Sequence, residues 1–231
     1  MFKRALRWSQ GGHGDQRADD ILYVVGEKVL LRDKRADDIA VDYSWRRDPE
    51  LSRLDATRPM QMSFSDYRRY AREEIEHDRR WSRRFAIDTH GGRHIGNCMY
   101  YDVDERRGEA ELGIMIGDRE YWSQGYGTDA VNTLLDYIFT STKLNKVYLH
   151  TLSWNSRARR CFAKAGFVEV RDVRRNSMDF VRMEVLREDW EGSRRRRADS
   201  EDEGTAMEMA RRPVTAAPSV RSGTGEGSPV A

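Results

Sequence analysis

The apolar residues of this chain follow two periods, one typical of helices and the other typical of strands. The clearest helical spacing lies in the middle of the chain, at Ala130, Val131, Leu134, Leu135 and Ile138. Short apolar runs of the strand type precede and follow this helix, at 110–116 and 146–152. The pattern therefore predicts a strand, a helix and a second strand in that order.

The same two periods place the other elements. Strands are predicted at 21–25, 28–32, 84–88, 94–102, 109–117, 146–152, 167–173 and 178–186, and helices at 36–46, 65–77 and 156–165 besides the central one. The first helix should end near Pro49, and Ser63 with Asp66 forms a candidate capping box for the second. This order predicts an α/β fold with a mixed central sheet and helices on both faces.

Four side chains carry specific expectations. Tyr67 and Tyr70 should face inward from the helix at 65–77. Cys161 lies among apolar residues of its helix, which favours core packing over a role as nucleophile. His150 alternates with apolar residues on a strand, where a hydrogen-bonded structural histidine is the usual outcome.

The two ends of the chain differ in composition from the middle. Residues 1–20 mix Arg, Gly, Gln and Asp without a period, and four arginines at 194–197 precede an acidic cluster and a stretch rich in Gly, Ser, Pro and Ala. Such segments bury too little apolar area to offset about 1–2 kcal/mol of backbone entropy per residue. We expect one domain at 21–191 between a disordered leader, 1–20, and a disordered charged tail, 192–231.

Composition and charge narrow the classes of partner. The formal net charge is +2 at pH 7, which gives no electrostatic case for nucleic acid. No apolar run is long enough to cross a membrane, and the five histidines are scattered without metal-ligand spacing. Cys98 and Cys161 both lie in apolar patterns, as reduced thiols do. We expect a soluble cytoplasmic protein without metal, nucleic acid or membrane as partner.

The loop between the central strand and helix carries a candidate phosphate site. In Trp122-Ser-Gln-Gly-Tyr-Gly-Thr-Asp-Ala130, Gly125 and Gly127 allow a ligand to approach the backbone at a helix N-terminus, and Thr128 adds a hydroxyl donor. A plain tight turn is the alternative interpretation. The dinucleotide pattern fails because residues 117–123 separate the strand from the glycines and the next strand lacks a closing carboxylate, and a P-loop would need Gly-Lys-Ser/Thr.

Two ordered motifs give this region a family resemblance. Residues 109–170 resemble the cofactor-binding core of the GNAT acetyltransferases, most closely the branch with ribosomal-protein N-terminal and polyamine acetyltransferases. The first motif is Tyr121-Trp-Ser-Gln-Gly-Tyr-Gly-Thr-Asp-Ala130, and the second is Trp154-Asn-Ser-Arg-Ala-Arg-Arg-Cys-Phe-Ala-Lys-Ala-Gly-Phe167. Weaker similarity extends from about Lys28 to Trp190. The resemblance implies the GNAT acyl-CoA N-acyltransferase fold.

The resemblance also implies where acetyl-CoA binds. The matching positions are backbone groups near Ile114, Met115 and Ile116, the loop residues Gln124, Gly125, Tyr126, Gly127 and Thr128, and Asn155 at the second motif. Gly113 would mark a bulge that lets two central strands splay apart. Asn155 also suits a helix cap, and the two roles are compatible.

Glu111 is the candidate catalytic residue. It lies on the strand that passes acetyl-CoA in this family, where a carboxylate takes a proton from an ammonium acceptor directly or through water. Simple pairing with a neighbouring Arg or Lys is the alternative. Phe162 stands where many members have a Tyr that protonates the CoA thiolate, and Tyr126, Ser153 and Ser156 are candidate substitutes.

These expectations lead to one function and one alternative. The chain is expected to be an N-acetyltransferase that moves acetyl from acetyl-CoA to a primary amine by direct attack. The acceptor is left open among a protein N-terminus, a polyamine and another small amine, and residues 55–59 would belong to its site. A homodimer is compatible with this reading. The alternative is a non-catalytic GNAT-fold module that binds acyl-CoA as a sensor or scaffold.

Overall fold

A computed structural model describes residues 23–76 and 81–196. Residues up to 191 form one compact unit, which is described here by itself. The predicted leader at 1–20 and the tail beyond 196 lie outside the described residues, whereas 187–196 are helical. Within the described residues, no helix is both long and apolar enough to cross a membrane.

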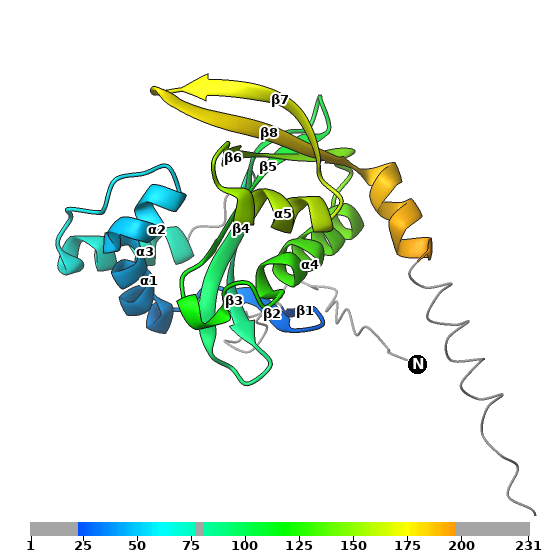
Figure 1. The fold of residues 1–231 in the computed structure, drawn as a ribbon. Coiled ribbons are helices and arrows are strands. Elements are labelled where there is room, and N and C mark those ends of the chain that lie inside the picture. Colours follow the sequence, from blue (N-terminus) through cyan, green and yellow to red (C-terminus); the bar gives the residue numbers. More distant parts are fainter. Residues whose placement is uncertain (1–22, 77–80, 197–231) are drawn as a thin grey trace, which may run out of the picture. The chain divides into compact units, whose positions relative to one another are not determined.

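An eight-stranded mixed sheet forms the centre of the fold, in the order β1-β2-β3-β4-β5-β6-β8-β7 (Figure 1). The parallel pair is β5 with β6, and every other neighbouring pair is antiparallel. The strands are β1 Tyr23–Val25, β2 Val29–Asp33, β3 Arg83–Thr89, β4 His94–Asp104, β5 Glu109–Ile116, β6 Lys146–Leu152, β7 Val168–Arg175 and β8 Met178–Leu186. The α/β class and the mixed sheet are as predicted.

The parallel pair at the centre of the sheet separates after a short contact. Pairing of β5 with β6 runs from Glu109 with Lys146 to Glu111 with Tyr148, and the rest of each strand has no register partner across this gap. The prediction of a bulge at Gly113 is wrong, because Gly113 pairs regularly with Met99. The register shift lies on β4 after Tyr101 instead. The splay therefore arises from divergence of the two strands.

Three helices lie between β2 and β3. They are α1 Ile39–Arg47, preceded by a 3-10 turn at Ala36–Asp38, α2 Pro49–Leu54 and α3 Phe64–Glu76. The sequence predicted the end of α1 but not α2. Pro49 starts α2 at its first position while the Asp48 side chain caps the helix by accepting from the N–H groups of Glu50 and Leu51.

The start of α3 follows the predicted capping box, but one inward side chain was wrongly assigned. The Asp66 N–H donates to Ser63 Oγ at 3.2 Å, and Ser63 Oγ donates to the Asp66 carboxylate at 2.6 Å. Tyr67 is buried as predicted, whereas Tyr70 is 47% exposed. Tyr70 follows Tyr67 by three positions, but the single buried residue of α3 shows how narrow its packed stripe is.

The other two helices, α4 Tyr126–Ser141 and α5 Ser156–Lys164, contact each other. The buried face of α4 packs on the apolar side of the sheet, which includes Leu31. Neighbouring Arg32 points to the opposite side, where it binds Asp38 beside α1. Helices therefore cover both faces, with α4 and α5 on one side and α1 on the other (Figure 1).

Asp129 fixes the N-terminal turn of α4 to the edge of the sheet. Its carboxylate accepts from the backbone N–H groups of Glu27, Lys28 and Val29 at 3.1, 2.7 and 3.0 Å. Gly26 makes this approach possible, because an added Cβ would lie 2.6 Å from the Asp129 carboxylate and 2.3 Å from Thr133 Oγ1. The helix N-terminus is thus held in place on the side away from α5.

A buried polar network joins α1 to the sheet. Arg32 forms ion pairs with Asp38 at 2.7 Å and with Asp88 at 2.6 Å, and all three residues are almost inaccessible to solvent. Burial acts against ionisation of Asp38, but its bond to Arg32 prevails and lowers its pKa to about 2. His94 extends the network by bonding Asp42 at 3.1 Å and Asp88 at 3.2 Å.

We predict that His94 makes the stability of the fold depend on pH. Burial alone lowers the pKa of His94, but the hydrogen bonds to Asp42 and Asp88 outweigh burial and raise it. The stabilisation is therefore complete below the unfolded pKa of about 6.5 and is lost as pH rises through the higher folded pKa. His94→Gln should cost on the order of 1 kcal/mol at pH 6.

Urea unfolding of the parent and of His94→Gln between pH 6 and pH 9 measures this effect. The difference in the free energy of unfolding should shrink toward pH 9, because the parent loses the charged imidazole. His90→Gln is the control, since His90 is exposed at the β3–β4 turn. A His94→Gln difference that stays constant over this range would contradict the prediction.

Candidate functional site

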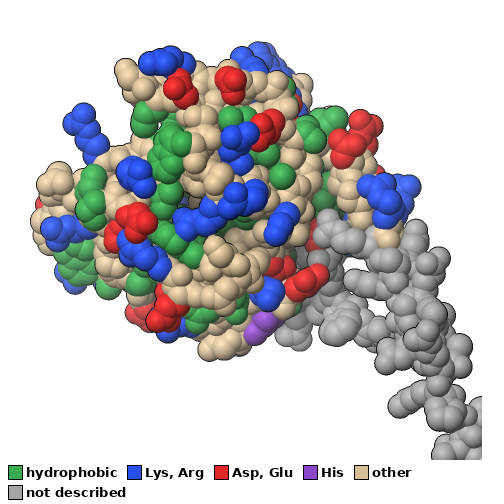
Figure 2. Space-filling view, in the orientation of Figure 1, with side chains coloured by type: hydrophobic (Ala, Val, Ile, Leu, Met, Phe, Trp, Pro, Cys, Tyr) green, Lys and Arg blue, Asp and Glu red, His purple; other side chains and the backbone are tan. Residues whose placement is uncertain are grey.

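A cleft of about 600 Å³ opens where β5 and β6 separate. Its walls come from α2, from β5 and β6, from the loop before α4, and from α5. Figure 2 shows a hollow in the molecular surface, with Lys and Arg side chains gathered beside it where Figure 1 places α5. The cleft therefore lies at the one place where the sheet leaves main-chain groups without strand partners.

The first turn of α4 forms one wall of the cleft. Gly125 caps the helix with φ of 89°, a left-handed conformation in which a side chain would be strained. The first N–H bonded within the helix is that of Asp129, so the N–H groups of Tyr126, Gly127 and Thr128 precede the intrahelical bonds. Gly125, Gly127 and Thr128 line the cleft. This arrangement favours a bound anion such as a phosphate.

Gly127 provides a test of fit for a ligand. A Cβ built on Gly127 would lie 3.5 Å from Cys161 Sγ and 3.7 Å from the Ile116 side chain, which are ordinary contacts. The protein itself therefore does not require a glycine here. The open space over its backbone is consistent with a ligand that approaches the main chain closely.

Basic side chains on α5 face the same wall. Arg157, Arg160 and Lys164 line the cleft, and the Arg157 guanidinium lies 3.6 Å from the centroid of the Trp122 ring. These three cations add to the positive end of α4. We did not single them out from the sequence, although their spacing of three and four residues indicated a common helix face.

The splayed part of β5 offers free backbone groups to the cleft. The Gly117 N–H donates to Ile95 O on the β4 side at 2.9 Å. Because successive residues of a strand alternate in direction, the backbone groups of Met115 face β4 too, while those of Ile114 and Ile116 face the gap toward β6. Ile116 O accepts from Trp122 Nε1 at 2.7 Å. Met115 lines the cleft with its side chain.

Glu111 and His150 meet on the opposite side of the sheet from α4 and α5. Glu111 Oε1 lies 2.8 Å from His150 Nδ1. His150 Nε2 lies 3.3 Å from the Arg175 guanidinium, which can only donate, so Nε2 accepts and Nδ1 carries the proton that Glu111 accepts. The Glu111 residue is 8% exposed and lines the cleft. His150 is hydrogen-bonded as the sequence predicted.

Two tyrosines lie close to the Glu111 carboxylate. Burial, the charge of Glu111 and a hydrogen bond to it raise the pKa of Tyr101 far above its usual value. Burial and the charge of Glu111 also raise the pKa of Tyr148. Both phenols stay protonated at neutral pH, so they stabilise Glu111 as a charged acceptor of protons.

The remaining predicted residues divide into two groups. Asn155 lines the cleft and caps α5 by accepting from the Ala158 N–H at 3.2 Å. Tyr126 instead packs on the core, and the Gln124 side chain donates to Glu120 O. Phe162 lines the cleft with a ring that carries no proton donor.

The prediction that Cys161 packs in the core is wrong. Cys161 lines the cleft and accepts a hydrogen bond from Thr128 Oγ1 at 3.5 Å. The apolar face of α5 does turn inward, but part of what it faces is the cleft. Burial raises the pKa of Cys161, so the thiol stays protonated at neutral pH and is a poor nucleophile.

Within the described residues, no group of three or more His, Cys, Asp or Glu side chains is arranged to hold a metal ion. The positive charge in the cleft comes from arginine and lysine side chains and from a helix N-terminus. This is a site for an anionic ligand with a long uncharged arm that fits between two strands.

Residues 28–168 match the family described as "Acetyltransferase (GNAT) domain". This match covers more than half of the chain. The chain therefore belongs to the GNAT acetyltransferases and is an N-acetyltransferase that uses acetyl-CoA. The resemblance drawn from the two motifs is confirmed.

Curated relatives agree with this family. The chain is 32% identical over 127 residues to the N-acetyltransferase p20 of Bacillus licheniformis, covering 52% of this chain and 68% of p20. It is 32% identical over 87 residues to spermidine N(1)-acetyltransferase of Vibrio cholerae, covering 38% of this chain and half of that relative.

Solved structures agree with the fold. Spermidine N-acetyltransferase from Vibrio cholerae in complex with CoA and spermine has a TM-score of 0.63 at 24% identity, over 71% of this chain and 98% of that chain. Aminoglycoside acetyltransferase AAC(6')-Ib in complex with coenzyme A has a TM-score of 0.61 at 22% identity, over 72% and 99%. At these identities the likeness shows the fold.

Proposed function

We propose that this N-acetyltransferase acts by direct attack of a primary amine on the thioester, with Glu111 as the base that takes the proton from the amine. The observation that carries the proposal is the position of Glu111. It is the last β5 residue paired with β6, so its carboxylate lies at the point where the cleft passes between the strands. An ammonium acceptor must lose a proton before its nitrogen attacks, and a buried carboxylate at that point accepts it.

The cofactor residues of this proposal follow the geometry of the cleft. The N–H groups at the start of α4, around Gly125, Gly127 and Thr128, bind the pyrophosphate of CoA, and Arg157, Arg160 and Lys164 balance the phosphate charge. The backbone of Ile114 and Ile116 and the Asn155 amide hold the pantetheine arm. Bound acetyl-CoA supplies the activated acetyl group, and the chain supplies position and proton acceptance.

Departure of the thiolate has no obvious acid in this chain. Phe162 occupies the usual position of a tyrosine and cannot donate a proton. Among the substitutes considered from the sequence, Tyr126 packs on the core. We propose that the thiolate leaves without a side-chain acid at the Phe162 position, as a thiolate of moderate basicity can.

Three further parts of the proposal rest on the relatives and on composition. Names of relatives mention spermidine and aminoglycosides, which supports an amine as acceptor here. The comparisons favour this enzyme over the non-catalytic sensor or scaffold. A cytoplasmic location, a domain at 21–191 with dispensable ends and a homodimer remain predictions.

A panel of acceptors with radiolabelled acetyl-CoA tests the proposed function. The panel includes peptides with free N-termini, polyamines and small primary amines, each matched with its N-acetylated form. At least one free amine should gain label together with stoichiometric CoA release, and its acetylated counterpart should not. If CoA binds but no amine in any class gains label, the non-catalytic alternative is the better account.

A further inference from the structure

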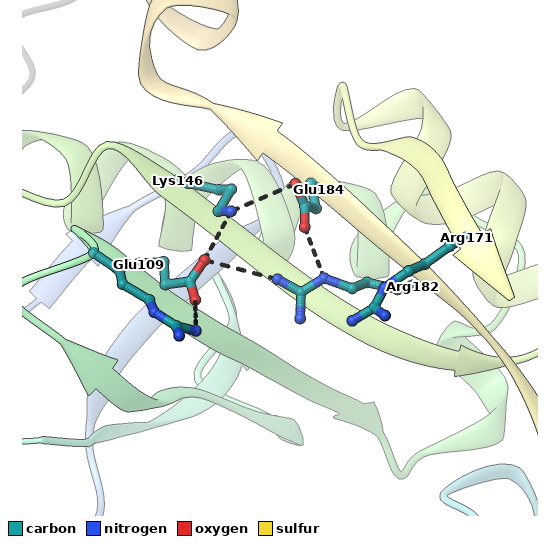
Figure 3. A pocket seen from close by; sticks show the side chains of 6 residues that line it. Glu109, Lys146, Arg171, Arg182 and Glu184 are labelled. Carbon is teal, nitrogen blue, oxygen red and sulfur yellow. Dashed lines mark hydrogen bonds and ion pairs between the residues drawn. The ribbon is translucent and has the colours of Figure 1, made fainter. Parts of the chain in front are cut away.

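A second pocket, of about 410 Å³, lies on the same sheet face as Glu111. We call it the outer basic pocket. It is open to solvent, and charged side chains from β5, β6, β7, β8 and the β4–β5 turn line it (Figure 3). Its residues are Arg107, Glu109, Lys146, Arg171, Arg182 and Glu184.

The pocket holds more positive than negative charge. Four of its residues are cations and two are carboxylates, which leaves an excess of two positive charges. Glu109 pairs with Lys146 at 2.7 Å, and Glu184 pairs with Arg182 at 2.7 Å. Arg171 forms no ion pair or hydrogen bond within the part of the chain that the structure describes, and Figure 3 shows it beside Arg182 without a bond to any drawn residue.

A β-bulge creates this excess of charge. Glu169 pairs with Met183 and Arg171 pairs with Arg182, so Val170 is an extra residue on β7. Without the extra residue, Arg171 would face the other side of the sheet. The bulge instead places two guanidinium groups directly opposite each other, where like charges destabilise a strand pair. An anion bound between them would remove this repulsion.

The outer basic pocket connects to the proposed catalytic base along the sheet. The Arg182 guanidinium lies 3.7 Å from the centroid of the Tyr148 ring, and Tyr148 pairs with Glu111. Glu109 lies two residues from Glu111 on β5, a distance of about 7 Å. An extended acceptor with its amine at Glu111 therefore reaches the pocket within a few residues.

We propose that the outer basic pocket binds the carboxylates of an acidic peptide whose free N-terminal amine lies at Glu111. This assignment rests on the proposed function, because it takes Glu111 as the point where the acceptor amine lies. An extended chain advances about 3.3–3.6 Å per residue, so acidic side chains at the third and fourth positions fit best. Arg171 and Arg182 bind them, with Arg107 and Lys146 at the rim. A polyamine extended in this direction meets repulsion.

Peptide binding to the full chain in the presence of saturating CoA tests the proposal without turnover. The probes are Ala-Ala-Glu-Glu-Ala and Ala-Ala-Gln-Gln-Ala, each with a fluorophore at its C-terminus, and fluorescence anisotropy gives the two dissociation constants. The Glu peptide should bind about three- to tenfold more tightly, the range expected for two exposed ion pairs. High salt should reduce this preference.

Two variants of β7 with equal change in charge separate the pocket from the general surface. Arg171→Glu should abolish the preference for the Glu peptide. Arg174→Glu should retain it, because Arg174 pairs with Asp179 outside the pocket and is 72% exposed at its side chain. Circular dichroism checks that both variants fold.

The outcomes distinguish this proposal from the proposed function. Equal binding of the two peptides, or a preference that survives in Arg171→Glu, overturns the outer basic pocket even if amines are acetylated. A preference that depends on Arg171 supports the pocket even if no amine in the acceptor panel gains label, in which case only the proposed function fails.

Discussion

Replacing Glu111 with Gln should lower turnover by about 10²–10⁴ while leaving CoA affinity nearly unchanged. The amide keeps the shape of the carboxylate and still accepts the hydrogen bond from His150 Nδ1, which is 2.8 Å from Glu111 Oε1 in the parent. It cannot take a proton from the acceptor. The loss should therefore appear in kcat with the best amine of the panel, and calorimetry should give the parent's Kd for CoA.

Raising the pH should restore part of the lost rate, because more of the acceptor then arrives as the neutral amine. An N-terminal amine has a pKa of about 7.7–8.0, so recovery should appear mainly between pH 7 and pH 9. His150→Gln is the matched control. It perturbs the same hydrogen bond but leaves the carboxylate, so its loss should be much smaller. A Glu111→Gln enzyme that turns over at the parent rate from pH 6 to pH 9 would contradict the assignment.

Replacing Gly127 with Ala should weaken CoA binding at least about tenfold without destabilising the protein. The added Cβ makes only ordinary contacts with Cys161 and Ile116, and alanine is the better helix former by up to about 1 kcal/mol. The methyl group occupies the space over the N–H groups of the first turn of α4. It should therefore displace the pyrophosphate and cost one or two charge-assisted hydrogen bonds.

Calorimetric titration with CoA and a thermal melt together measure this effect. Gly91→Ala serves as control, since its Cβ would meet only Thr89 Oγ1, at 3.6 Å, and Gly91 lies in the β3–β4 turn away from the cleft. Gly125 is less suitable, because its φ of 89° makes any side chain a strain on the fold. Parent-like CoA affinity in a folded Gly127→Ala protein would show that the phosphates bind elsewhere.

Patterns within a single element predicted most of the fold. β6 and β8 occur at the predicted bounds, because each alternates between an apolar and a polar face along its length. The helix α2 was missed, since Pro49 was interpreted as the end of α1. A proline stops one helix and starts the next by the same restriction of φ, and the cap from Asp48 decides between the two.

Features that depend on contacts between elements could not be predicted. The bond between His150 and Glu111 requires the register of β6 against β5, and no local pattern specifies that register. The position of Cys161 failed for a related reason. A helix turns apolar residues toward a dry core and toward a ligand cleft alike, so the period of α5 cannot distinguish the two.

A single turnover with acetyl-labelled acetyl-CoA tests the central claim most directly. Enzyme in excess over acetyl-CoA is mixed with the amine that the acceptor panel identifies, and acid quenching at successive times separates acetyl-CoA, protein and acetylated amine. Direct attack predicts that label passes from acetyl-CoA to the amine, with none bound to protein at any time. Label on the protein that rises and then falls, at Cys161 or elsewhere, would contradict direct attack assisted by Glu111.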